Sequence, residues 1–168
     1  MRSSSAICVW GHLDADFVEQ LVAQVLDQSP AYVRVNRLMH LNAPDSGRDI
    51  EAYCLVSDGL TETRHERAIV QVRHRPTRSV SGTDIAELVH AKLPLWEGEP
   101  IRRLIIATTG SFTQDAVRLI DDHNFAAKRP TIIAWSSHEL QALIRKFLPT
   151  VADDLRTQHQ RCCGGGGF

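Results

Sequence analysis

Three side chains at the ends of neighbouring strand-like segments have the chemistry of a phosphate-cleaving site. Gln71 and Arg73 stand two residues apart at the end of the apolar run Ala68–Val72, and Asp49 precedes a second strand-like segment, 50–56. Residues two apart on a strand project from the same face. A carboxylate and a carbonyl oxygen can hold Mg²⁺, which prefers oxygen ligands. A nearby cation can then stabilise the charge that builds up on a phosphate.

The same residues also have a purely structural interpretation. An aspartate that closely follows a glycine, as Asp49 follows Gly47, is often a turn residue. Gln71 could serve only as a hydrogen-bonded residue of a sheet, and Arg73 only as a solvated strand end. The chemistry of the three side chains leaves both interpretations open.

The elements that must position these residues are easiest to recognise in the first half of the chain. Residues 16–27 have one wide apolar face, with Asp14 as the N-cap, and predict a helix that ends before Ser29-Pro30. The next segments predict a strand, a turn, a strand, a polar hairpin loop and a strand, at residues 32–35, 42–49, 50–56, 57–67 and 68–73. Asp49 therefore opens one strand of a hairpin, and Gln71 and Arg73 close its partner.

The second half of the chain alternates between helices and apolar strands. A helix is predicted over 83–93, and the motifs Ser111-x-x-Gln114 and Ser136-x-x-Glu139 predict capping boxes at the start of two more helices. Each of these two helices follows a continuous apolar run that is typical of a strand buried on both faces. The order helix–strand–strand–strand–helix–strand–helix–strand–helix predicts an α/β fold, with a mixed central β-sheet flanked by helices.

Composition limits the class of protein. The 168 residues suit one domain, and the net charge of −1 means that any nucleic-acid surface must be local. No apolar run approaches the ~18 residues of a membrane span, so we expect a soluble, cytoplasmic protein with no membrane partner. We divide the chain into an N-terminal segment, 1–13, a domain, 14–150, and a tail, 151–168, which we expect to be disordered from about residue 160 because it ends in Cys-Cys-Gly-Gly-Gly-Gly-Phe.

Five motifs together resemble the Mrr-like restriction endonuclease domain, a family of the PD-(D/E)xK nuclease superfamily. They are PDSGRDIEAY, AIVQVRHR, SVSGTDIAEL, IIATTGSFTQDAV and AWSSHELQALI, at residues 44–53, 68–75, 79–88, 105–117 and 134–144. Their order and spacing extend the resemblance over residues 14–148. The resemblance implies a restriction-endonuclease-like fold and a DNA endonuclease that uses Mg²⁺, or Mn²⁺ in its place.

The resemblance also implies roles for individual residues. Asp49 matches the aspartate that binds metal, and Gln71 matches the glutamine form of the second metal-binding position. Glu19 is the candidate for the helical glutamate that often completes the site; a simple exposed glutamate is the alternative. Arg73 stands where the family has lysine. Arginine can hold a phosphate through two hydrogen bonds, but it keeps its proton and cannot accept one from water.

This departure leaves three functions open. The first is a Mg²⁺-dependent endonuclease of the restriction and defence type. The second is a catalytically impaired module that binds DNA without cutting it. The third is the effector domain of a larger defence protein, since the resemblance implies a domain that often stands beside sensor or ATPase modules. No GxxxxGK[ST] loop occurs in this chain, so we expect no ATPase within it. Cutting both strands at once needs two sites, which a homodimer would supply.

Two features are candidates for contacts with DNA. Arg75 and Arg78 belong to a basic stretch at 64–78, and cationic side chains of this kind bind phosphates. Ser111 and Thr113 stand at a predicted helix start, where free backbone N–H groups favour an anion. The alternatives are a solvated hairpin for the arginines and a capping motif without a ligand for the two hydroxyl side chains.

Overall fold

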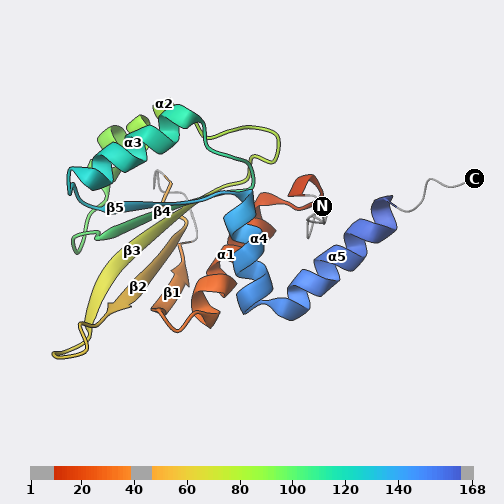
Figure 1. The fold of residues 1–168 in the computed structure, drawn as a ribbon, viewed down its shortest axis with the longest axis horizontal. Helices are drawn as coiled ribbons and strands as arrows, with labels where there is room; N and C mark the ends of the chain where they lie inside the picture. The colour runs from red at the N-terminus through yellow and green to blue at the C-terminus, as the bar shows by residue number, and fades with distance from the viewer. Residues whose placement is uncertain (1–9, 39–46, 164–168) are drawn as a thin grey trace, which may run out of the picture.

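The computed structural model describes residues 10–38 and 47–163, which form a five-stranded mixed sheet and its flanking helices (Figure 1). The strands lie in the order β1-β2-β3-β4-β5; the first three are antiparallel, and β3, β4 and β5 are parallel. They are β1 Tyr32–Arg37, β2 Ile50–Val56, β3 Arg64–Arg73, β4 Arg103–Thr108 and β5 Thr131–Trp135. The mixed central sheet predicted from the sequence is confirmed.

Helices cover both faces of the sheet and enclose two hydrophobic cores (Figure 1). One core lies under α1 (Ala15–Gln28), α4 (Ser137–Phe147) and the beginning of α5 (Pro149–Cys163). The other lies under α2 (Gly82–Glu87) and α3 (Gln114–Phe125). Strand β3 faces both cores, since Val70 belongs to the first and Ile69 to the second. Its end is therefore fixed from both sides of the sheet.

Helix α1 begins and ends close to where the sequence predicts. Oδ1 of Asp14 accepts a hydrogen bond from the backbone N–H of Phe17 at 2.7 Å, which confirms the predicted N-cap. The apolar face is buried except for Phe17, which is 36% exposed. The capping box of Ser136 and Glu139 at the start of α4 is also confirmed.

Strand β3 is longer than predicted, because residues 64–67 are paired with β2 and do not belong to the loop. Val56 pairs with Arg64 and Tyr53 with Arg67. The polar character of this stretch predicts a loop, but Arg67 is buried and forms a 2.7 Å ion pair with Glu51. The paired charges make a polar strand stable here.

The start of α3 depends on how Val80 pairs with residues 111–113. Val80 donates its N–H to the carbonyl of Ser111 at 2.8 Å and accepts one from Thr113 at 2.9 Å. These bonds hold 111–113 extended, so the predicted capping box at Ser111 is wrong and Thr113 is the N-cap of α3. The helix predicted over 83–93 is α2 followed by a π-helical turn, Leu88–Lys92, and a short 3-10 helix, Leu93–Leu95.

The core extends past both predicted domain limits. Trp10 is buried and donates from Nε1 to Oγ of Ser137 at 2.8 Å. Ala152 and Leu155 of α5 belong to the core under α1. Helix α5 includes residues 160–163, so the disorder predicted from about 160 is wrong for these four residues; 164–168 lie outside the described residues.

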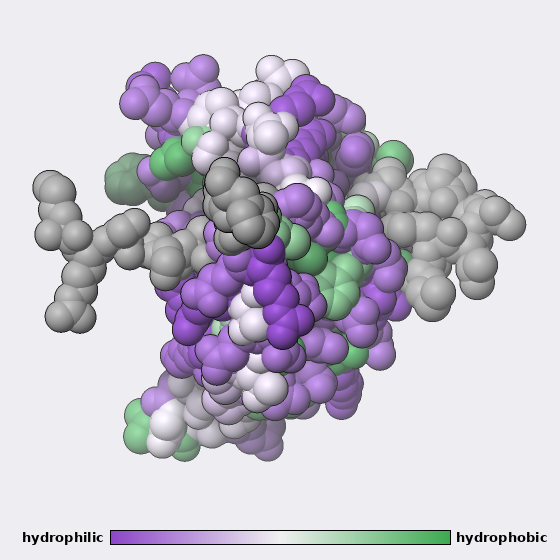
Figure 2. All heavy atoms as spheres, turned by 90° about the vertical axis from the view of Figure 1, so that its right-hand side faces the viewer, coloured by the Kyte–Doolittle hydropathy of each residue, from purple (hydrophilic) through white to green (hydrophobic). Residues whose placement is uncertain are grey.

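The surface on the α5 side is mainly hydrophilic, with apolar side chains only in small patches (Figure 2). None of the helices in the described part of the chain has both the length and the apolar character needed to cross a membrane.

Candidate active site

The carboxylate of Asp49 is fixed at the end of β3. Asp49 directly precedes β2, and its Oδ2 accepts a 2.6 Å hydrogen bond from the backbone N–H of Val72. The last pair of the β2–β3 ladder is Ile50 with Val70, so Asp49 lies one position further, beside Gln71. The predicted hairpin therefore places Asp49 at the strand end that carries Gln71.

Gln71 and Arg73 share one face of β3, as predicted. Nε of Arg73 donates to Oε1 of Gln71 at 3.2 Å, and Gln71 is 5% exposed. On its other side the Gln71 amide meets the backbone of Gly47, which has a φ of +89°. A Cβ atom at Gly47 would lie 2.5 Å from Nε2 of Gln71, so both conformation and space require glycine. The Gln71 amide is therefore held in one place.

Asp84, which was not predicted from the sequence as a site residue, joins two of the predicted functional arginines. Its carboxylate accepts from Arg73 at 2.9 Å and from Arg75 at 3.2 Å. Burial raises the pKa of Asp84, but hydrogen bonds from Ser81 and the charges of the two arginines outweigh burial and hold that pKa well below its usual range. The motif Ser81-x-x-Asp84, a capping box with aspartate, was the available signal.

Glu19 lies on α1 within electrostatic range of Asp49. Its Oε1 accepts from Nε of Arg37 at 3.0 Å, and its side chain is 20% exposed. Burial is the main cause that raises the pKa of Glu19; the Arg37 hydrogen bond opposes it, and the charge of Asp49 adds to it. Two carboxylates that repel one another are a suitable environment for a cation.

The side-chain oxygen atoms at this strand end are suitable ligands for a magnesium ion. Within 10–38 and 47–163, no group of three or more His, Cys, Asp or Glu side chains is arranged to hold a metal. Mg²⁺ needs fewer protein ligands, since it keeps several waters and is held by one or two carboxylates. Asp49 and the amide oxygen of Gln71, which has a second lone pair, are suitable ligands, and Glu19 could contribute a further oxygen. That Asp49 and Gln71 share one ion stays a prediction.

The candidate DNA-contacting residues gather around the end of β4. The buried Thr109 accepts from the backbone N–H of Arg75 at 2.8 Å, and its Oγ1 lies 3.1 Å from Nδ1 of His74. The loop after β3 passes so close to Gly110 that a Cβ atom there would overlap the carbonyl oxygens of Arg75 and Arg78. The two arginines therefore lie in a loop that is braced against β4.

The two hydroxyl candidates have local partners. Oγ of Ser111 lies 2.8 Å from Oγ of Ser79, which places Ser111 beside the loop that carries Arg78. Oγ1 of Thr113 accepts from the backbone N–H of Ala116 at 3.2 Å as the N-cap of α3. Contact of either residue with DNA stays a prediction. Thr109, which anchors the arginine loop, was missed because an apolar strand that ends in Thr-Thr-Gly gives no sign of what will pack on it.

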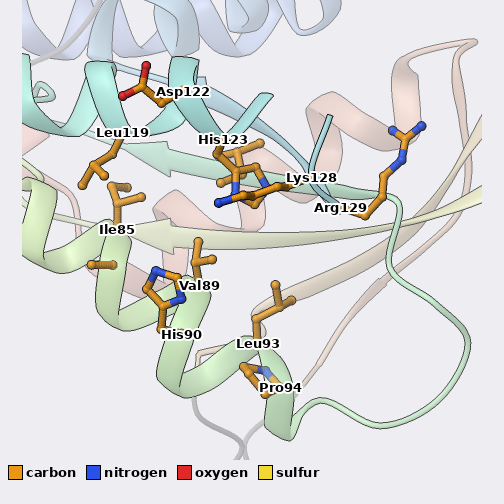
Figure 3. A pocket seen from close by; sticks show the side chains of 12 residues that line it. Ile85, Val89, His90, Leu93, Pro94, Leu119, Asp122, His123, Lys128 and Arg129 are labelled. Carbon is orange, nitrogen blue, oxygen red and sulfur yellow. The ribbon is translucent and has the colours of Figure 1, made fainter. Parts of the chain in front are cut away.

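A cavity of about 600 Å³ opens in the α2–α3 layer (Figure 3). The side chains of Ile85, Val89 and Leu119 form apolar walls, and His90 and His123 face it from either side. None of the eight candidate residues lines this cavity. The candidate catalytic groups lie instead at the end of β3, outside this cavity.

The fold and this strand end define the class of protein: an α/β domain with the restriction-endonuclease-like fold. The chain belongs to the restriction endonuclease family whose Mrr_cat model matches residues 12–144. The family predicted from the motifs is therefore confirmed.

Two solved restriction endonucleases share this fold. The DNA modification-dependent restriction endonuclease AspBHI superposes with a TM-score of 0.56 at 13% identity, over 88% of this chain and 36% of its own. MspJI restriction endonuclease, in complex with a 27-mer oligonucleotide, gives 0.53 at 19% identity, over 90% of this chain and 34% of its own. The chain thus spans about a third of each. No curated protein matches the sequence.

Proposed function

We propose that the chain is a Mg²⁺-dependent DNA endonuclease of the restriction and defence type, with Mn²⁺ as an alternative ion. The observation that carries this proposal is the fixed carboxylate of Asp49 on the Val72 amide, next to the buried pair of Gln71 and Arg73. Membership of a restriction endonuclease family supports hydrolysis of a DNA phosphodiester bond.

Each residue at this strand end has its own role in the proposed reaction. Asp49 and Gln71 would hold the metal ion, with Glu19 beside them on α1. When bound, the ion supplies stabilisation of the negative charge that develops on the phosphate. Arg73 adds a permanent positive charge at the same strand end, but it cannot act as a base because a guanidinium keeps its proton. Gly47 and Arg73 keep the Gln71 amide oriented from its two ends.

Removal of the metal ion should stop DNA cleavage. Supercoiled plasmid incubated with the protein and Mg²⁺ or Mn²⁺ should be converted to nicked or linear DNA, and excess EDTA should stop the conversion. Readdition of Mg²⁺ beyond the EDTA concentration should restore it. The measurement is gel quantification under single-turnover conditions, and the matched control is the Asp49→Asn protein. Cleavage that continues in EDTA would contradict the proposal.

One observation favours the alternative, a DNA-binding module with impaired catalysis. Arg73 is tied to Asp84 and Gln71, and its side chain is only 10% exposed. It is therefore less available to a phosphate than a free cation would be. This alternative predicts that the protein leaves the plasmid uncut with either Mg²⁺ or Mn²⁺ and still binds DNA in a separate binding measurement.

The second prediction concerns the loop arginines. Arg75→Ala combined with Arg78→Ala should weaken DNA binding and reduce the slope of log K against log salt by about one to two units, because each phosphate contact contributes about 0.9. Fluorescence anisotropy with duplex DNA over a salt series measures the slope. The control is Arg156→Ala with Arg161→Ala on α5, which removes the same charge elsewhere. Equal slopes for the two double variants would assign DNA binding to another surface.

The size of the structural relatives bears on the biological setting. Because the chain spans about a third of each, we propose that it acts as the nuclease part of a larger defence system, beside a sensor or ATPase module, in the cytoplasm where foreign DNA arrives. Two copies would be needed to cut both strands, and a homodimer is the simplest arrangement.

A further inference from the structure

The cation beside the candidate metal ligands is held by other side chains. Arg73 donates from Nε to Gln71 at 3.2 Å and from one terminal nitrogen to Asp84 at 2.9 Å. Arg75 approaches the same Asp84 carboxylate. Two of the five N–H donors of Arg73 are therefore engaged by protein groups. A cation whose head group is mobile and has fewer protein partners would stabilise the charge of a phosphate at this strand end more strongly.

Lys92, which follows α2, lies close to Gln71, one of the two candidate metal ligands. A Cβ atom at Gly47 would lie 2.5 Å from Nε2 of Gln71 and 3.9 Å from Cδ of Lys92, so the two side chains approach one another around the Gly47 backbone. Nζ is two bonds beyond Cδ. Its ion pair with Glu87 is long, at 3.8 Å, and Glu87 is 57% exposed. An exposed pair of this length is weak and leaves the ammonium group mobile.

The backbone at Lys92 departs from a regular α-helix. In an uninterrupted α-helix, Lys92 would follow the fully buried Leu88 by four residues and share its face. The N–H of Leu93 instead donates to the carbonyl of Leu88, so Leu88–Lys92 forms a π-helical turn. The additional residue in this turn changes the direction of the Lys92 side chain relative to its direction in a regular α-helix. Single π-helical turns inside helices are frequent at functional sites.

We infer that Lys92 is a catalytic residue of the proposed nuclease, whose ammonium group contacts a non-bridging oxygen of the DNA phosphate to be cleaved. It adds a mobile positive charge to that of Arg73, whose guanidinium is held by Asp84. Its role is electrostatic and requires no proton transfer. This inference rests on the proposed function.

Chemical labelling tests the contact without cleavage. The chain has three lysines, Lys92, Lys128 and Lys146, so acetylation by limiting acetic anhydride can be followed at each by mass spectrometry. In EDTA, duplex DNA should lower the acetylation of Lys92 several-fold relative to the two exposed reference lysines. Mobility shift on the same samples establishes that DNA is bound. Bound protein in which Lys92 is no better protected than the references would overturn the inference.

Substitution separates the inference from the proposed function. Lys92→Gln should lower the single-turnover cleavage rate about 10²-fold, the usual effect of losing one donor to a transition-state charge. Lys92→Arg keeps the charge and should recover most of the rate, whereas Lys128→Gln and Lys146→Gln should match wild type. If Asp49→Asn abolishes cleavage and Lys92→Gln leaves it unchanged, the proposed function stands and the inference fails. If wild type neither binds nor cuts DNA, both fail.

Discussion

Replacing Asp49 with asparagine is expected to lower metal-dependent DNA cleavage by about 10³-fold or more. A metal ion typically supplies several kcal/mol of transition-state stabilisation, and each 1.4 kcal/mol is about tenfold in rate. Asparagine removes the charge that attracts the ion but keeps an oxygen that can accept the Val72 hydrogen bond, now 2.6 Å long. The fold should therefore persist while activity is lost. Single-turnover cleavage and thermal unfolding measure the two effects.

Asp49→Ala would be a less informative variant, because it leaves the partly buried Val72 N–H without its partner, at a cost of about 1 kcal/mol or more. The matched control is Asp121→Asn, which removes the same charge from an exposed position on α3. Rapid cleavage by Asp49→Asn with an unchanged metal requirement would show that the ion is held elsewhere.

The architecture could be predicted because its signals are local. The alternation of Ile50, Ala52 and Cys54 and the apolar run of β4 depend only on which face each residue buries. The common face of Gln71 and Arg73 follows from strand geometry in the same way. Asp49 could be placed beside them because a hairpin fixes which strand ends meet.

The remainder of the site depends on contacts between residues distant in sequence. Asp84 stands 11 positions after Arg73 and pairs with it only because α2 crosses the strand end. Thr113 replaces Ser111 as the N-cap because Val80 holds 111–113 extended. The π-helical turn that orients Lys92 leaves the apolar pattern of a helix intact, so periodicity cannot reveal it. These features arise from packing, and a single sequence carries little signal for them.

Gly110→Ala is expected to be the most destabilising small substitution near the site. No left-handed conformation is required of Gly110; the restriction is space, because a Cβ atom would overlap the carbonyl oxygens of Arg75 and Arg78. Backbone atoms cannot rotate away as a side-chain end can. The loop is further held by the Thr109 hydroxyl on the Arg75 N–H at 2.8 Å. Overpacking of a tight site typically costs about 3 kcal/mol at its upper range.

For a domain of this size that cost lowers Tm by about 6–12 °C, measured by calorimetry. Gly11→Ala is the matched control, because a Cβ atom there meets nothing within 4 Å, and it should stay within about 0.5 kcal/mol of wild type. The folded Gly110→Ala protein should also bind DNA more weakly, since the loop must move and carries Arg75 and Arg78 with it. Gly11→Ala should bind as wild type does. If both variants had the same Tm and the same DNA affinity, the loop would not be braced on Gly110, and the placement of the two arginines at the end of β3 would be wrong.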